Sequence, residues 1–178
     1  MLVTIYCGGI KMSDYLVKLY DLPPIDGFMK KVTDNGITIR RPIGPEKYAV
    51  IEWVEENFNL LWAGETECAF FKSPKGVFIA IDDKTGKMLG FACYDATAKG
   101  FFGPTGVAEE SRGSGIGSAL LMACLNAMRE EGYGYAIIGA VGPSAFYEKI
   151  CGATVIEGSS PGIYKGMQRA KNWQSAKK

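Results

Sequence analysis

The sequence VAEESRGSGIG, residues 107–117, decides the fold of this chain. It has the pattern of a strand that ends near Val107, a turn rich in glycine, and a helix that starts near Ile116. The first amides of a helix have no partner within the helix, and the helix dipole makes that end positive. Because glycines let phosphate oxygens approach such amides, the stretch predicts a diphosphate site, with Arg112 as a cationic contact.

The residues that follow predict the longest helix of the chain, over 116–131, which Gly132 ends. Its apolar residues recur at helical spacing and form one face that must pack on a sheet: Leu120, Leu121, Cys124, Leu125 and Met128. The next run, 135–141, is almost unbroken in apolar character, which is typical of a buried parallel strand.

Three successive strands are expected directly before this helix. Residues 77–82 and 87–95 have the period-two pattern of strands, and the turn residues 82–86 between them predict a hairpin. Residues 101–107 predict the third strand. Glycine and proline within it indicate a bulge or a kink: Gly103, Pro104 and Gly106.

The first part of the chain predicts a helix that opens at Pro24 and stops at Asn35-Gly36, followed by a strand over 36–41. Pro45 then starts a helix with four apolar positions, Tyr48, Ile51, Val54 and Phe58, and a second helical piece covers 66–71.

The last part of the chain predicts a short helix from Pro143 to about Ile150. Two final strands are expected at 153–156 and 163–167, before a polar, basic tail.

Composition excludes several classes of function. The 178 residues suit one domain, and the net charge of +1 gives no indication of a nucleic-acid partner. The longest apolar runs are far shorter than the roughly 20 residues that span a bilayer, so no membrane partner is expected. The first residues lack the pattern of a secretory signal, so we expect a cytoplasmic protein. Residues 8–11 can be encoded by a sequence that resembles a ribosome-binding site, so Met12 is a candidate start.

The absence of histidine removes Ser-His-Asp and Cys-His nucleophile systems and His-ligated metals. The five cysteines are an odd number, and none forms a C-x-x-C pair. The sequence therefore predicts neither a disulfide framework nor a metal site.

The glycine-rich stretch departs from two well-known nucleotide motifs. It lacks the Lys-Ser/Thr ending of a Walker loop, and the spacing of Gly113, Gly115 and Gly117 is not that of dinucleotide folds. Coenzyme A is therefore favoured over a nucleotide as the ligand.

Residues 112–117, Arg-Gly-Ser-Gly-Ile-Gly, resemble the signature of the GNAT superfamily of N-acyltransferases. Val107 stands where the family's fourth strand carries a valine, and residues 146–149 are similar to its Phe-Tyr-Glu-Lys segment. The resemblance implies an α+β fold with a mixed, mostly antiparallel central sheet flanked by helices. That domain would cover 36–178, with residues 1–35 as an N-terminal extension packed on it, of which 1–11 are not native if Met12 is the start.

The same resemblance implies acetyl-CoA as the acyl donor, lying where the fourth and fifth strands of the family splay apart, and a primary amine of a small molecule as the acceptor. The amine would attack directly in a ternary complex. Tyr147 would assist the departing thiolate, and Thr105 would face the acceptor. The implied cofactor-binding residues are Val107, Ala108, Arg112, Gly113, Ser114, Gly115, Ile116, Gly117, Ser118 and Ser144.

Two features leave alternatives open. The family's asparagine before the tyrosine helix is missing, so Ser144 either replaces its amide or caps the helix. Without histidine, the candidate bases are carboxylates that are equally typical of a solvated surface: Glu65, Glu67, Glu109 and Glu110.

Two rival functions remain beside the enzyme. One is a noncatalytic acyl-CoA-binding sensor or interaction module with the same fold, and the other is a nucleotide-binding regulatory domain. The sequence leaves the oligomeric state open, with a homodimer as one option.

Overall fold

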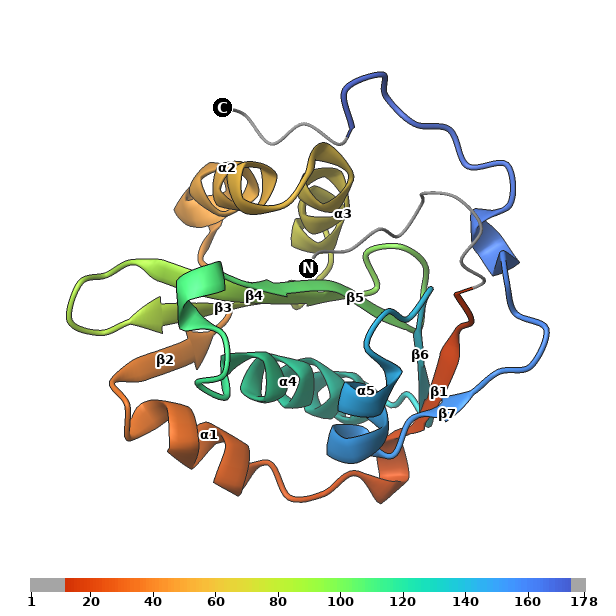
Figure 1. The fold of residues 1–178 in the computed structure, drawn as a ribbon. Coiled ribbons are helices and arrows are strands. Elements are labelled where there is room, and N and C mark those ends of the chain that lie inside the picture. Colours follow the sequence, from red (N-terminus) through yellow and green to blue (C-terminus); the bar gives the residue numbers. More distant parts are fainter. Residues whose placement is uncertain (1–11, 174–178) are drawn as a thin grey trace.

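The computed structural model describes residues 12–173, so residues 1–11, which precede the candidate start, lie outside the described residues. Within this range a seven-stranded sheet has the order β2-β3-β4-β5-β6-β1-β7 (Figure 1). Every neighbouring pair is antiparallel except β5 and β6, which are parallel, so the predicted mixed sheet is confirmed. The strands are β1 (Tyr15–Lys18), β2 (Ile37–Arg40), β3 (Val77–Asp82), β4 (Met88–Tyr94), β5 (Phe101–Val107), β6 (Tyr135–Ile138) and β7 (Thr154–Val155).

Helices cover both faces of this sheet, as Figure 1 shows. One face carries α2 (Lys47–Asn57) and α3 (Leu60–Phe70), and the other carries α1 (Asp26–Thr33), α4 (Ile116–Glu130) and α5 (Ser144–Cys151). Each interface has its own hydrophobic core, the larger one around α4 and the smaller one beneath α2 and α3. Short 3-10 turns occur at Leu19–Asp21, Gly44–Glu46, Glu109–Ser111 and Gly162–Tyr164.

The helix α4 is the centre of the larger core, and all five residues of its predicted apolar face are fully buried. It begins at Ile116 as predicted and ends one residue early, at Glu130. Because α4 lies between the sheet and α1, its burial extends beyond one face and includes Met122 and Asn126. The buried side-chain amide of Asn126 donates a hydrogen bond to the carbonyl of Met122, at 2.8 Å.

The prediction of a final strand over 163–167 is wrong. A 3-10 turn lies at Gly162–Tyr164, and the sheet is extended instead by β1, which lies between β6 and β7. The Asp14 carboxylate beside β1 accepts a hydrogen bond from the Ala140 amide, at 2.8 Å, and the Ser13 carbonyl accepts one from Val141. Part of the segment 1–35 is therefore inside the sheet, while a boundary at residue 35 stays a prediction.

Two details of the predicted helices differ in the structure. Tyr48 lies on the exposed side of α2, 75% accessible, because Val50 and Val54 form its buried face. The predicted piece at 66–71 is the second half of α3. That helix begins at Leu60, because the Asn59 side chain caps it by accepting from the Trp62 amide at 2.9 Å.

The bulge predicted for the strand at 101–107, which is β5, is confirmed. The register of its pairing with β4 shifts between Ala92 and Tyr94. Gly106 has a further reason to be glycine. A Cβ on it would overlap the ring of Phe58, which packs directly on the β5 backbone. This close contact brings the turn between α2 and α3 against the strand that leads to the glycine-rich loop.

Candidate active site at the split between two strands

The glycine-rich loop begins where β5 ends. The amide of Ala108 still donates to Leu89 of β4, at 2.8 Å, and the 3-10 turn at Glu109–Ser111 then redirects the chain. Gly113 and Gly115 have φ values of +83° and +95°, a region that side chains with a Cβ rarely adopt. The two glycines therefore turn the chain directly into α4.

The first amides of α4 have no acceptor within the described protein. Gly115 occupies the N-cap position without a side-chain cap, and the first backbone bond of the helix runs from Ala119 to its carbonyl. Within residues 12–173, no protein acceptor receives a hydrogen bond from the amides of Ile116, Gly117 or Ser118. Such amides, at the positive end of a 15-residue helix, favour an anionic ligand.

Two cationic side chains lie beside these amides. Lys31 of α1 extends over Gly115, and its Nζ lies 3.5 Å from the position that a Cβ on this glycine would take. Arg112 is exposed, and its Nε donates to the carbonyl of Val107 at 3.4 Å. Both charges are placed to attract the same anion as the helix dipole.

The strands β5 and β6 separate next to this loop. They pair only at Phe101 with Ile137 and at Phe102 with Ile138, while β5 continues to Val107. The Ala108 amide bonds to β4, and successive residues of a strand direct their backbone groups to alternate edges. The N–H and C=O of Val107 therefore point to the edge of β5 that faces away from β4. Beyond Phe102 this edge of β5 has no strand partner among the described residues.

A cleft of about 1030 Å³ opens at this separation. The expected site residues Thr105, Ser144 and Tyr147 all line it, together with Phe102 and Pro104 of β5. Its far side reaches α3, at Trp62 and Glu65. The structure thus brings three predicted residues from distant parts of the sequence into one cavity.

Tyr147 is 8% exposed, and its ring makes edge contacts with the rings of Phe146 and Phe102. Burial of the phenol, with a smaller effect from Cys151, raises the pKa of Tyr147 to about 12. The hydroxyl is therefore protonated at neutral pH and is available as a hydrogen-bond donor.

The two remaining predicted residues of the cleft differ in what they do. Thr105 donates its hydroxyl to the carbonyl of Phe91 at 3.1 Å, which fixes this side chain within the sheet. The suggestion that Ser144 caps its helix is wrong, because Pro143 takes the N-cap position and α5 has no side-chain cap.

Among the four candidate bases, the structure separates Glu65 from the others. Glu109 and Glu110 are exposed on the 3-10 turn, and Glu67 forms an ion pair with Lys47 at 2.8 Å. Glu65 lines the cleft and accepts a hydrogen bond from the hydroxyl of Thr97. Its burial raises its pKa, although the bond from Thr97 opposes that shift.

The sequence did not identify Lys31 as a member of the site, and it did not distinguish Glu65 from the other three candidate bases. Lys31 is far from the glycine-rich loop in sequence, and its helix reaches the loop only because α1 packs on α4. Glu65 lies in a stretch whose helical pattern was visible only from residue 66 onward. A start of α3 at Leu60, signalled by the Asn59 cap, would have placed it on a helix.

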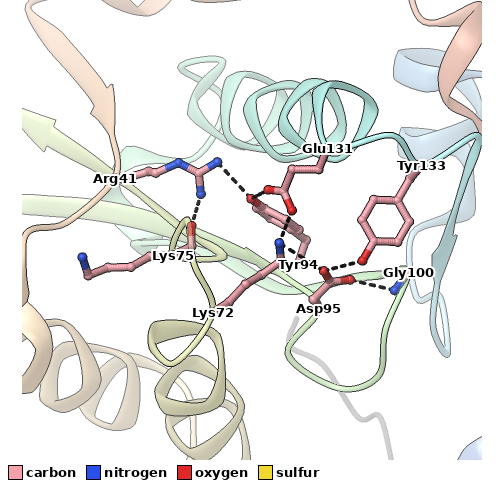
Figure 2. Close-up of polar contacts among 8 residues, drawn as sticks. All are labelled: Arg41, Lys72, Lys75, Tyr94, Asp95, Gly100, Glu131 and Tyr133. Carbon is pink, nitrogen blue, oxygen red and sulfur yellow. Dashed lines mark hydrogen bonds and ion pairs between the residues drawn. The ribbon is translucent and has the colours of Figure 1, made fainter.

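A second polar cluster lies at the opposite end of α4, shown in Figure 2. Glu131 accepts hydrogen bonds from Lys72 and from the hydroxyl of Tyr94, which in turn accepts one from Arg41 at 2.9 Å. Lys72 also lies 3.5 Å from Asp95. Two cations balance two carboxylates here, so this cluster is a satisfied structural network.

The described range, residues 12–173, contains no group of three His, Cys, Asp or Glu residues that could hold a metal ion. No helix in it is both long and apolar enough to cross a membrane.

Residues 45–153 match the model of the acetyltransferase (GNAT) family. The fold is also similar to a GCN5-related glucosamine N-acetyltransferase region of a fungal multi-domain GH3 β-N-acetylglucosaminidase. That match has a TM-score of 0.68 and 14% identity, and covers 84% of this chain and 20% of the other. No curated protein sequence matches this chain.

Two bacterial structures show the same fold. A GCN5-related N-acetyltransferase from Sphaerobacter thermophilus has a TM-score of 0.60 and 24% identity, covering 83% of this chain and 50% of the other. One from Kribbella flavida has a TM-score of 0.57 and 16% identity, covering 82% and 55%. This chain therefore spans between a fifth and just over half of the length of these three proteins.

Proposed function

Because the chain belongs to the acetyltransferase (GNAT) family, we propose that it transfers the acetyl group of acetyl-CoA to a primary amine of a small molecule. One observation carries the proposal: the uncapped amides that begin α4 stand next to the open edge of β5. An anion-binding loop beside an unpaired strand edge suits a ligand with a diphosphate at one end and an amide-bearing arm.

The loop would hold the diphosphate of the donor. The amides of 113–118 would donate to its oxygens, each bond contributing about 1.5 to 3 kcal/mol, while the helix dipole adds about 0.3 to 1. Lys31 and Arg112 would add charge from two sides. The donor's pantetheine amides would pair with the open edge of β5 as an added strand does.

The transfer itself needs only the two substrates and groups of this chain. The amine nitrogen forms a bond to the thioester carbonyl carbon, the carbon–sulfur bond breaks, and the sulfur leaves as a thiolate that takes a proton. Backbone amides near Val107 would stabilise the oxyanion of the tetrahedral intermediate.

Tyr147 would stabilise the departing sulfur by a hydrogen bond. With a pKa of about 12 against about 8.5 for a thiol, full proton transfer from Tyr147 would be unfavourable by about 5 kcal/mol. The phenol would therefore donate a hydrogen bond to the thiolate, whose proton is supplied by the solvent or by the acceptor.

The direct test measures release of the CoA thiol from acetyl-CoA with a library of primary amines. Amine-dependent release is expected. Binding of acetyl-CoA without release by any amine would support the noncatalytic sensor instead.

A thermal-shift comparison addresses the other rival. CoA should stabilise the protein more than ADP or NAD at equal concentration. Equal or greater stabilisation by ADP or NAD would favour a nucleotide-binding domain and overturn the proposal.

A further inference from the structure

The cleft that Tyr147 lines has a chemical character of its own. Large apolar and aromatic side chains form much of its wall, among them Trp62, Phe102, Pro104 and Val141. Glu65 is the only side chain with a formal charge among the described residues that line it. Hydroxyl and amide side chains also line the cleft, but its exposed lining is more apolar than polar, so a ligand seated here meets mainly apolar surface and one carboxylate.

Glu65 has no cation of its own. Within residues 12–173, no lysine or arginine lies within ion-pair distance of its carboxylate. The carboxylate accepts a hydrogen bond from the hydroxyl of Thr97, which leaves further acceptor positions on it for a ligand. A partly buried carboxylate that lacks a counter-charge favours an incoming cation, in keeping with the raised pKa of Glu65.

The loop that carries Thr97 is held firmly at its base. Asp95 accepts hydrogen bonds from the Gly100 amide at 2.7 Å and from the Tyr133 hydroxyl at 2.8 Å, as Figure 2 shows. The network at the far end of α4 thereby fixes both ends of the loop 95–100. Thr97, and through it the carboxylate of Glu65, is oriented by the protein before a ligand binds.

We propose that Glu65 receives the ammonium group of the acceptor, and that the acceptor is a monoamine with an apolar or aromatic body. This inference rests on the proposed acetyl transfer. The ammonium would pass one proton to the carboxylate, and the neutral amine that results would attack the thioester. Glu65 is thus a catalytic residue that touches the acceptor nitrogen.

The same walls argue against the other acceptor classes. A polyamine would bring further ammonium groups to a lining that holds no second charged side chain among the described residues, and an amino sugar would place several hydroxyls against a lining that is more apolar than polar. The carboxylate of an amino acid would stand in the same apolar site as Glu65 and be repelled by it.

Matched pairs of amines test the class of acceptor. In CoA-release assays, 2-phenylethylamine should give a kcat/KM at least about ten-fold above phenylalanine, which differs by one carboxylate, and above spermidine and glucosamine. If spermidine, glucosamine or phenylalanine is the best substrate, the inference is wrong while the proposed acetyl transfer stands. Absence of release with every amine would instead contradict the proposed function.

Glu65→Gln tests the residue, with Glu67→Gln on the same helix as the matched control. Glu65→Gln should lower kcat/KM for the amine about 100-fold or more, the usual contribution of a general base, and leave CoA affinity within about two-fold. Glu67→Gln should behave as the wild type. The Tm of Glu65→Gln should equal or exceed that of the wild type, which would show that the variant is folded. Full amine kcat/KM in Glu65→Gln would overturn the assignment.

Discussion

Lys31→Gln should weaken CoA binding about ten-fold. The Nζ of Lys31 lies 3.5 Å from the Cβ position of Gly115, within reach of any phosphate held by the amides of α4. A hydrogen bond from a charged donor contributes about 1.5 to 3 kcal/mol, and we take the lower value because Lys31 is exposed to water. A loss of about 1.4 kcal/mol is a ten-fold change in Kd.

Isothermal titration calorimetry with CoA measures this effect, and Lys30→Gln supplies the control. Lys30 precedes Lys31 on the same helix and carries the same charge, but it is bonded to Asp34 at 2.8 Å. Lys30→Gln should therefore bind CoA as the wild type does. The difference between the two variants should shrink as salt rises, because ions screen an exposed charge.

Two results would refute the reasoning about Lys31. An affinity of Lys31→Gln within two-fold of the wild type at low salt would show that this side chain does not meet the ligand. Equal weakening in both variants would show that only the net charge of α1 matters. Tm values in the absence of CoA should match for all three proteins, so a fall in one would point to folding instead.

In chemical denaturation, Gly115→Ala should destabilise the protein by about 1 to 2 kcal/mol, because φ is +95° there. A Cβ at Gly117 meets only ordinary contacts, the nearest at 3.6 Å, so Gly117→Ala should change stability by less than about 1 kcal/mol. Tyr147→Phe should lower kcat with CoA affinity unchanged, and wild-type turnover would remove the assigned role. Folding raises the pKa of Glu65, so the free energy of unfolding should fall as pH rises above the pKa that Glu65 has in the unfolded chain. The Tm advantage of Glu65→Gln over the wild type should therefore grow from pH 4 to pH 7, and a constant difference would contradict the shift.

Local patterns were enough to predict the parts of the fold that depend on neighbouring residues. The helix α4 was predicted from its apolar spacing, and its first residue from the glycines that precede it. The hairpin of β3 and β4 follows from turn residues within a few positions. In these segments the sequence preference and the tertiary environment agree.

The parts that depend on distant contacts could not be predicted. The four residues of β1 are too few for a pattern, and their place is set by partners such as Ile138 and Val155. Residues 163–167 alternate like a strand, yet β1 occupies the position beside β7. For the same reason the sequence suggested Tyr147 and the loop through a local motif, but not the approach of Lys31 to Gly115.

The position of β1 has a practical consequence for how this protein can be shortened. A fragment cut to the family match, 45–153, would lack β1, β2 and β7 while retaining the whole glycine-rich motif and Tyr147. The edge of β6 that pairs with Tyr15–Lys18 would then present bare amides and carbonyls, a template for aggregation. The Ala140 amide would lose Asp14, releasing the segment that forms one wall of the cleft. Expression trials should therefore keep residue 12 onward, even though the recognisable motif begins almost a hundred residues later.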